Sequence, residues 1–178
     1  QTMAKHFTRY STRIVTRSFS KAFGLASLRI GYTLASAKRN KELDKIRVGK
    51  NINALAQVAA CASLDDIDHM NRYVDEVHLA KEWLLEKFES AGITARDTAA
   101  NFLLIQIPNP QDTIKKLEEH NIYIRDRSKI PQLEGFIRIT VGDMLTMNRF
   151  WKVFETLPQE WLINYKPQPQ TNSLKNNI

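Results

Sequence analysis

After Gly92 the sequence alternates between short runs of β-forming residues and segments in which apolar side chains have helical spacing. This alternation restricts a chain to a layered α/β fold, in which helices cover a sheet. The predicted strands span residues 101–107, 121–125 and 136–141, and the predicted helices span residues 112–120 and 147–157. Their β-α-β-β-α order predicts a small α/β sandwich domain of about 75 residues.

Before Gly92 the sequence predicts two strands and three helices. The strands are expected at residues 13–19 and 31–35, and the helices at residues 38–48, 53–64 and 66–90. The second helix is rich in alanine and nearly uncharged, which suits burial between other elements. The third helix starts with three acids and ends at a glycine, as helices commonly do.

We divide the chain into two domains and a tail. Residues 1–77 are expected to form one domain and residues 78–165 the small α/β domain. Residues 166–178 are rich in Pro, Gln and Asn with almost no apolar side chains. Such a composition predicts an extended or disordered tail.

The composition excludes several classes of protein. No run of about 18 apolar residues could span a membrane, and no basic-then-apolar leader indicates secretion. The single cysteine, Cys61, cannot form an intramolecular disulfide, so we expect a reducing, cytoplasmic location. No Cys or His residues have the spacing of metal ligands, and the acids before His69 suit a helix start, so we expect no metal site.

Positive charge is concentrated at the start of the chain. Residues 1–50 contain 12 Lys and Arg against Glu42 and Asp44, a net charge of +10, while the whole chain carries +7. A basic solvated face, a nucleic-acid surface or a site for a phosphorylated small molecule would each account for the excess. The charge alone does not decide among them.

The segment Ser18–Tyr32 concentrates groups that suit phosphate and carbonyl chemistry. Ser18 and Ser20 supply hydroxyls before Lys21, and Arg29 follows eight residues after the lysine. Hydroxyls and a guanidinium fork bind a phosphate group well. A lysine held among them and partly desolvated is a usable nucleophile for a carbonyl group. The alternative is an exposed lysine in a basic strand-loop-strand segment. The residues by themselves do not decide between a nucleophilic lysine and an exposed one.

The same segment, Ser-x-Ser-Lys-Ala-Phe-Gly-Leu-Ala-x-x-Arg-x-Gly-Tyr, resembles the cofactor-lysine motif of the class I/II aminotransferases, pyridoxal-phosphate enzymes of fold type I. The resemblance assigns the catalytic role and the covalent attachment of pyridoxal 5'-phosphate to Lys21. It assigns the cofactor phosphate to Ser18 and Arg29, with Ser20 as a weaker candidate. The implied α/β fold is the end of the large cofactor domain, residues 1–77, followed by the small domain.

A second pair of motifs resembles the C-terminal signature of histidinol-phosphate aminotransferases. Tyr-Ile-Arg-Asp ends at Asp126, and Ile-Arg-Ile-Thr-Val-Gly begins at Ile137. The resemblance assigns the carboxylate or phosphate of the substrate to Arg138, with Arg125, thirteen residues earlier, as its helper. A planar guanidinium binds either anion in two-point fashion. The alternative for Arg138 is an outward strand residue paired with an acid.

The resemblance covers residues 10–157 and implies the C-terminal part of a longer enzyme. In this family an aspartate paired with the pyridine nitrogen, an aromatic ring stacked on the cofactor and a glycine-rich loop precede the lysine strand. Nothing before Ser18 matches these groups. We therefore expect this chain to be inactive alone, and the complete enzyme to be a homodimer.

The implied activity is amino-group transfer between L-histidinol phosphate and 2-oxoglutarate, a step of histidine biosynthesis. The expected partners are a small-molecule amino donor and an oxo acid, with no nucleic acid and no membrane. An aromatic aminotransferase or a threonine-phosphate decarboxylase of the same branch is the alternative enzyme. The alternative of a different class is a non-enzymatic basic module that binds nucleic acid through residues 1–50.

Overall fold

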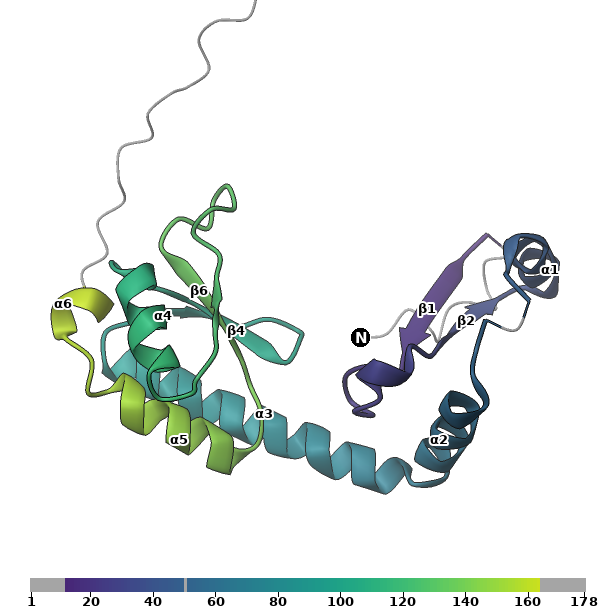
Figure 1. Ribbon diagram of the computed structural model, residues 1–178, viewed down its shortest axis with the longest axis horizontal. Coiled ribbons are helices and arrows are strands. Elements are labelled where there is room, and N and C mark those ends of the chain that lie inside the picture. Colours follow the sequence, from purple (N-terminus) through teal and green to yellow (C-terminus); the bar gives the residue numbers. More distant parts are fainter. Residues whose placement is uncertain (1–11, 50, 164–178) are drawn as a thin grey trace, which may run out of the picture. The chain divides into compact units, whose positions relative to one another are not determined.

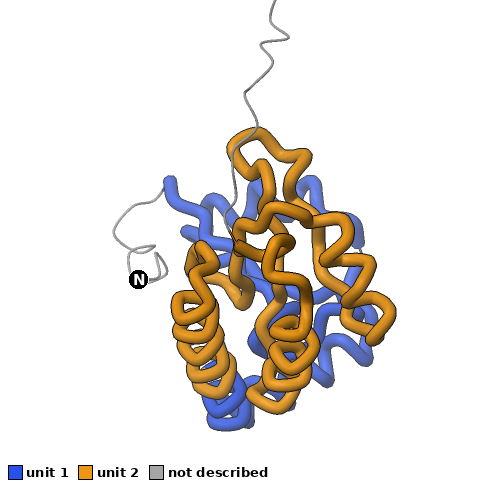
Figure 2. Tube along the Cα trace, turned by 90° about the vertical axis from the view of Figure 1, so that its left-hand side faces the viewer, with its two compact units in different colours: residues 1–74 blue, residues 75–178 orange. Residues whose placement is uncertain are grey.

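A computed structural model describes the chain over residues 12–49 and 51–163. The chain divides into two compact units, unit 1 over residues 1–74 and unit 2 over residues 75–178 (Figure 2). The division falls inside the long helix α3 (Ile67–Ser90), and the domain boundary expected from the sequence lies in the same helix. The predicted tail lies outside the described residues.

Unit 1 contains a β-hairpin (Figure 1). β1 (Ile14–Ser18) pairs antiparallel with β2 (Gly31–Ala35), with Ser18 opposite Gly31 at one end. Both strands lie where the sequence predicts them, because their β-branched and aromatic residues favour extended backbone. A glycine is required at position 31, since a Cβ there would lie 2.6 Å from the carbonyl oxygen of Arg17.

Two helices follow the hairpin, α1 (Ala37–Ile46) and α2 (Ala54–Asp65). Ser36 and Asn53 cap their first turns, because each side-chain oxygen accepts a hydrogen bond from a backbone N–H in the helix. Both helices lie close to their predicted positions.

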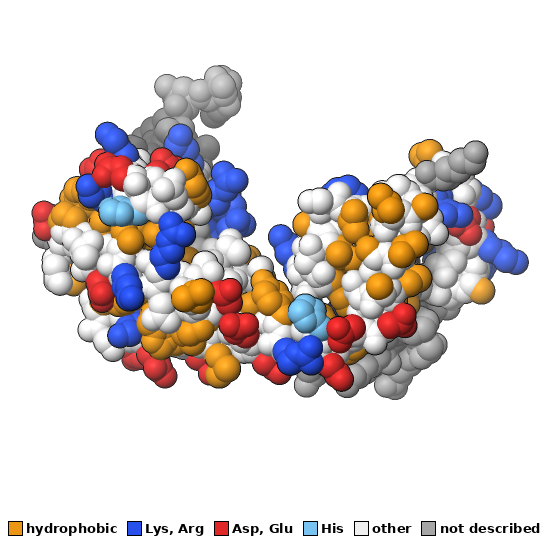
Figure 3. All heavy atoms as spheres, turned by 60° about the horizontal axis from the view of Figure 1, so that its bottom comes forward, with side chains coloured by type: hydrophobic (Ala, Val, Ile, Leu, Met, Phe, Trp, Pro, Cys, Tyr) orange, Lys and Arg blue, Asp and Glu red, His pale blue; other side chains and the backbone are white. Residues whose placement is uncertain are grey.

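The prediction that α2 is suited to burial is correct on one face only. Ala56 and Ala60, four residues apart, are buried against Phe19 in the core of unit 1. Leu55 is 77% exposed and Val58 68% exposed. Among the described residues of unit 1 no element covers these other faces, and hydrophobic side chains gather on the surface of the unit (Figure 3).

α3 begins where the sequence predicts it. The carboxylate of Asp66 accepts a hydrogen bond from the N–H of His69 (3.1 Å) and caps the first turn. Gly92, with a φ of 71°, ends the helix. The buried residues of α3 recur at spacings of three and four and form one stripe: Val77, Ala80, Lys81, Leu84 and Phe88. A lysine in such a stripe is unusual, because lysine is rarely buried without a partner.

The strands of unit 2 are β3 (Thr94–Arg96), β4 (Phe102–Gln106), β5 (Arg125–Asp126) and β6 (Phe136–Thr140). They form an antiparallel sheet in the order β3-β4-β6-β5. β4 and β6 confirm the sequence prediction. β3 was not predicted, because three residues are too few to show an alternating pattern.

The remaining helices of unit 2 are α4 (Pro110–Glu118), α5 (Met144–Phe154) and α6 (Gln159–Leu162). Pro110 occupies the first turn of α4, where its fixed φ is favourable, and does not merely end a strand. Asp143 caps α5 by accepting the N–H of Thr146 (2.7 Å), so this helix begins three residues earlier than predicted. None of the helices in the described part of the chain combines the length and hydropathy needed to cross a membrane.

The prediction of a strand over residues 121–125 is wrong except at its last residue. Asn121 has a left-handed φ of 58°, and the N–H of Ile122 donates to the carbonyl oxygen of Leu117 (3.0 Å). These residues therefore close the C-terminal end of α4 instead of pairing in the sheet. Ile122 still packs against the core, which explains the strand-like pattern.

The core of unit 2 lies between one face of the sheet and the helices α3 and α5 (Figure 1). Its most buried members, each at most 3% exposed, include Phe88, Leu103, Ile105, Ile137, Ile139, Phe150 and Phe154. Because successive strand side chains point to opposite faces, the other face of the sheet carries Phe102, Leu104 and Arg138.

Candidate functional site

The predicted lysine lies in the loop that joins β1 and β2. The N–H of Phe19 donates to the carbonyl oxygen of Ile30 (3.3 Å), which closes the loop at its base. Ser18 is the last residue of β1 and pairs with Gly31, two residues after Arg29. The hairpin therefore brings the backbones of Ser18 and Arg29 to the same end of the strand pair.

Lys21 lies in a tight turn within this loop. The N–H of Ser20 donates to Ser18 Oγ (3.0 Å), and the N–H of Gly24 donates to the carbonyl oxygen of Lys21 (2.8 Å). Gly24 has a φ of 70°, a conformation that suits glycine. The sequence leaves open whether Lys21 is partly desolvated or exposed; the Lys21 side chain is exposed, since no described residue of unit 1 covers it.

Arg29 adopts an uncommon backbone conformation for a large side chain. Its φ of 54° and ψ of 41° are left-handed, which costs about 1–3 kcal/mol for a residue other than glycine. Its Nη1 donates to the carbonyl oxygen of Ala26 (3.3 Å). The remaining guanidinium donors have no hydrogen-bond partner among the described residues, so the exposed fork can bind an anion.

Phe19 anchors the loop to the core of unit 1. The side chain is 4% exposed and belongs to the buried cluster that includes Ala56 and Ala60. Its ring centroid lies 4.9 Å from that of Phe23 and 5.7 Å from that of Tyr32. Because Phe19 lies directly between two predicted phosphate-binding serines, its burial fixes the backbone from which both project.

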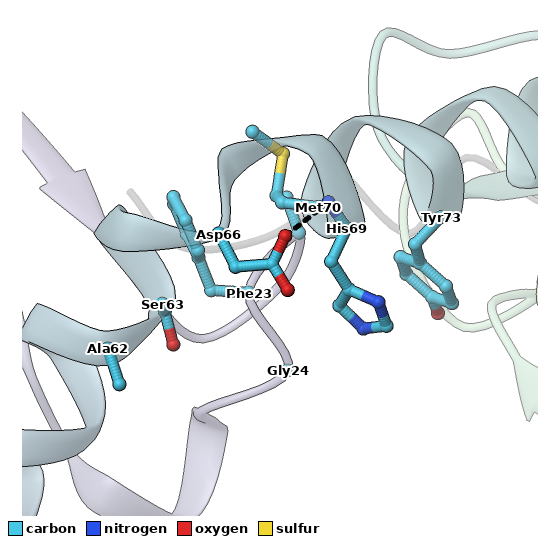
Figure 4. Close-up of a pocket in the computed structure, with 9 residues that line it drawn as sticks. Phe23, Gly24, Ala62, Ser63, Asp66, His69, Met70 and Tyr73 are labelled. Carbon is cyan, nitrogen blue, oxygen red and sulfur yellow. Dashed lines mark hydrogen bonds between the residues drawn. The ribbon is translucent and has the colours of Figure 1, made fainter.

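A cavity of about 520 Å³ lies beside the residues that follow Lys21 (Figure 4). It is lined by loop residues together with residues of α2 and α3, namely Ala22, Phe23, Gly24, Ala62, Ser63, Asp66, His69, Met70 and Tyr73. None of the predicted site residues lines it. In residues 12–49 and 51–163, no three His, Cys, Asp or Glu side chains gather as metal ligands would.

The two predicted substrate arginines lie side by side in the sheet of unit 2. Arg138 on β6 pairs in register with Arg125 on β5 and with Leu104 on β4. Arg125 is exposed and Arg138 is half-buried. Like charges directly opposite each other on neighbouring strands repel, so an anion bound between them would stabilise the arrangement.

Arg138 has a support other than an acid. Its Cζ lies 5.3 Å from the ring centroid of Phe102, within the range of a cation–π contact. Its Nε is buried without a hydrogen-bond partner, and no acid in the described part of the chain forms an ion pair with it. A buried donor without a partner is costly, which makes Arg138 suited to a ligand that accepts hydrogen bonds.

Sequence reasoning missed two residues near these arginines. Phe102 was placed in a strand and, with Asn101, resembled a family position only weakly, without a role toward Arg138; Lys81 was not noticed at all. A signal for Lys81 was available, since it interrupts the apolar stripe of α3 between Ala80 and Leu84. The contact of Phe102 with Arg138 gave no local signal, because it joins residues 36 positions apart.

The fold is that of the C-terminal part of fold type I pyridoxal-phosphate enzymes. The structure of histidinol-phosphate aminotransferase from Sinorhizobium meliloti in complex with pyridoxal-5'-phosphate matches with a TM-score of 0.69 at 26% identity, over 83% of this chain and 40% of that one. L-threonine-O-3-phosphate decarboxylase from Porphyromonas gingivalis matches with a TM-score of 0.70 at 25% identity, over 86% and 49%.

The sequence defines the family. The sequence profile of the family described as aminotransferase class I and II matches residues 2–154, and the chain belongs to this family. Histidinol-phosphate aminotransferase from Ruminiclostridium cellulolyticum is 36% identical over 134 residues, which are 75% of this chain. Dihydroxyacetone phosphate transaminase Cj1437c from Campylobacter jejuni is 37% identical over 150 residues, which are 82% of this chain. The matches span 37% and 40% of these two relatives.

Proposed function

We propose that this chain is the C-terminal part of a pyridoxal-phosphate-dependent aminotransferase, in which Lys21 binds the cofactor covalently. The observation that carries the proposal is the loop between β1 and β2, which presents Lys21 in a tight turn between Ser18 and Arg29. Membership of the class I and II family supports the same role for the loop.

The donors of this loop fit the chemistry of pyridoxal phosphate. Ser18, Ser20 and Arg29 offer two hydroxyls and a guanidinium fork at one end of the hairpin, which suits a phosphate group. Lys21 offers an amine, which suits an aldehyde. The exposure of Lys21 and Arg29 leaves both side chains accessible to such a ligand.

Proton transfer is the second task of Lys21. When bound, the cofactor supplies an electron sink for the charge that develops at the substrate α-carbon. Lys21 Nζ, once released by the incoming amino substrate, accepts the α-proton and later returns a proton, as a general base and acid. Ser18, Ser20 and Arg29 keep the phosphate fixed during these steps, so the lysine works at constant geometry.

Arg138 and Arg125 bind the anionic group of the substrate. Arg138 supplies the planar fork with its unpartnered Nε, and the exposed Arg125 adds a second cation from the neighbouring strand. Two-point hydrogen bonding orients a carboxylate or phosphate more strictly than a single charge does.

We propose L-histidinol phosphate and 2-oxoglutarate as the substrate pair, and histidine biosynthesis as the process. Support comes from the relatives, since histidinol-phosphate aminotransferase from Ruminiclostridium cellulolyticum is 36% identical to this chain. Two other similar proteins suggest the alternative reactions, a dihydroxyacetone phosphate transaminase and a threonine-phosphate decarboxylase. The names of both also contain a phosphorylated compound. A site with two arginines fits this common feature, because a guanidinium fork binds a phosphate group in two-point fashion.

We propose further that the complete enzyme is a cytoplasmic homodimer and that this chain alone is inactive. The apolar side chains of Leu55 and Val58, exposed on α2, support additional subunit or domain contacts. The exposed thiol of Cys61 suits a reducing compartment. Sedimentation of the full-length enzyme would measure the oligomeric state.

The test of the activity uses Lys21→Ala in the full-length enzyme that contains this chain, with Lys38→Ala, an exposed lysine of α1, as the matched control. We expect Lys21→Ala to abolish transamination while the cofactor still binds noncovalently, and Lys38→Ala to keep normal turnover. Near-normal turnover by Lys21→Ala would overturn the proposal.

The substrate is tested separately by product analysis. The enzyme is incubated with L-histidinol phosphate, L-threonine O-3-phosphate or an aromatic amino acid, each with 2-oxoglutarate, and glutamate and carbon dioxide are measured. Glutamate from histidinol phosphate alone supports the proposed pair. Carbon dioxide from threonine phosphate would instead indicate the decarboxylase.

A further inference from the structure

We propose that Lys81 is a positioning residue for Arg138, acting through the turn between β3 and β4 and the ring of Phe102. The inference rests on the proposed function, because it concerns the arginine to which we assign the substrate anion. Lys81 touches neither substrate nor cofactor in this account, and its effect is transmitted through packing and hydrogen bonds.

Lys81 is a buried cation whose donors are all used. The residue is 8% exposed, on the core face of α3. Its Nζ donates to the carbonyl oxygens of Thr98 and Ala100, the latter at 3.0 Å, and forms an ion pair with Asp97 Oδ1 (2.5 Å). An ammonium group has three donors, and the three acceptors all belong to the turn between β3 and β4.

Hydrogen bonds also connect the turn between β3 and β4 to the start of β4. Asp97 Oδ1 accepts the N–H of Thr98 (2.6 Å), and Thr98 Oγ1 donates to the carbonyl oxygen of Phe102 (2.7 Å). The carbonyl oxygen of Asn101 accepts the N–H of Val141 (2.9 Å), which joins the turn to the end of β6. The backbone of Phe102 is therefore held from both sides.

Phe102 in turn supports the guanidinium of Arg138. The ring centroid lies 5.3 Å from Arg138 Cζ, and Phe102 pairs with Thr140, two residues from Arg138 on the same sheet face. Since Arg138 Nε has no hydrogen-bond partner and no acid in the described residues pairs with the side chain, this ring is the contact that orients the fork.

Removal of the Lys81 amine leaves two carbonyl oxygens and Asp97 without their cation. The turn then relaxes to satisfy these groups with water, and Phe102 loses its fixed position. A role confined to stability predicts a different outcome, in which the variant unfolds more easily but its folded form keeps the geometry of Arg138.

The first experiment uses the 178-residue chain and needs no activity. We measure the nuclear magnetic resonance signal of the Arg138 Nε–H, assigned with Arg138→Lys, in Lys81→Met, Lys81→Arg and the exposed-lysine control Lys152→Met. We expect Lys81→Met to shift this signal and speed its hydrogen exchange. Lys81→Arg, which keeps a cation with several donors, should leave the signal near that of the wild type, as should Lys152→Met.

Asp97→Asn is a milder variant. If Lys81→Met does not fold, Asp97→Asn tests whether the contacts of Lys81 orient Arg138. It removes the ion pair but keeps both carbonyl contacts of Lys81, and the Asp97 side chain is 60% exposed, so the fold should persist. We expect a smaller shift of the same Arg138 signal. An unchanged signal in the folded variants would overturn the inference.

The second experiment uses the full-length enzyme. Lys81→Met should raise KM for the phosphorylated amino donor by about tenfold while kcat changes little, because binding geometry and not proton transfer is affected. A roughly tenfold loss in kcat with an unchanged KM would contradict the proposal that Lys81 positions Arg138. Wild-type enzyme without aminotransferase activity would count against the proposed function, whereas the Arg138 signal would still decide the coupling to Lys81.

Discussion

Arg138 and Arg125 lie opposite each other on the neighbouring strands β6 and β5, and their positive charges repel each other. The exposed Arg125 can move away into water, whereas the half-buried Arg138 is held against Phe102. This asymmetry supports the proposal, first made from the family resemblance, that Arg138 is the main anion contact and Arg125 its helper. At the scale of single residues, the proposed anion site therefore combines a half-buried guanidinium with an exposed one.

This difference leads to a prediction for the full-length enzyme. Arg138→Lys should raise KM for both the amino donor and the oxo acid, because lysine keeps the charge but loses the two-point fork. Arg125→Ala should act in the same direction with a smaller effect. Cofactor binding should be unchanged in both variants.

Steady-state kinetics with both substrates, together with a cofactor titration, separates the alternatives. Unchanged KM values would mean that Arg138 is an ordinary strand residue. A loss of cofactor affinity at normal KM would mean that the arginine belongs to the cofactor site instead.

At the scale of elements, the packing of α2 decides where the lysine loop lies. Ala60 is 6% exposed and packs with Phe19, so a larger side chain at this position has no room. Ala60→Leu should lower the free energy of unfolding by about 1–3 kcal/mol through overpacking. Ala62→Leu, at an exposed position on the same helix, should change it little. Urea unfolding measures both, and equal values for the two variants would contradict the proposed anchoring.

The N-terminus of α5 gives a prediction about pH. The hydroxyl and the N–H of Thr146 hold the pKa of Asp143 below its ordinary value. Because the pKa is lower in the folded state, the stabilisation is present above the unfolded pKa of about 3.9 and is lost as pH falls through the folded value.

Two variants separate capping from charge. Asp143→Ala should cost about 1 kcal/mol at pH 7, whereas Asp143→Asn keeps a cap of similar quality. At pH 7 the wild type should still be slightly more stable than Asp143→Asn, because only the carboxylate adds a negative charge at the helix N-terminus, and it should lose this advantage as pH falls below about 4. Urea unfolding at several pH values gives these differences, and a difference that does not change with pH would show that the Asp143 charge is irrelevant.

Short-range patterns account for most of what the sequence predicted. The hairpin, the start of α3 and its end at Gly92 depend on neighbouring residues, so they were predictable. The strand expected at Asn121 failed because a left-handed residue closing α4 produces the same apolar spacing as a strand. The contacts of Lys81 with the turn at Thr98 depend on tertiary packing between distant segments, which no local pattern reports.

The same reasoning applies to the candidate site. The motif around Lys21 identified the residues that the hairpin brings to one end, since Ser18 and Arg29 lie close in sequence to its two strands. The spacing of thirteen residues suggested that Arg125 assists Arg138, but only the sheet register makes them neighbours. The sequence left open whether Lys21 is exposed or partly desolvated, because burial depends on which groups cover the loop.

At the scale of the whole molecule, the chain consists of two compact units and spans 37% and 40% of the two relatives compared above. The lysine loop belongs to unit 1 and the arginine pair to unit 2. The full-length enzyme is therefore the proper material for any test of cofactor chemistry.

The central claim, that Lys21 carries the cofactor, is tested most directly by chemical fixation. The full-length enzyme is incubated with pyridoxal phosphate, reduced with borohydride, digested and analysed by mass spectrometry, with Lys21→Ala treated in parallel. We predict a stoichiometric pyridoxyl group on the peptide that contains Lys21, and its loss in the variant. Stoichiometric modification of a different lysine, or no stoichiometric modification at all, would contradict the account.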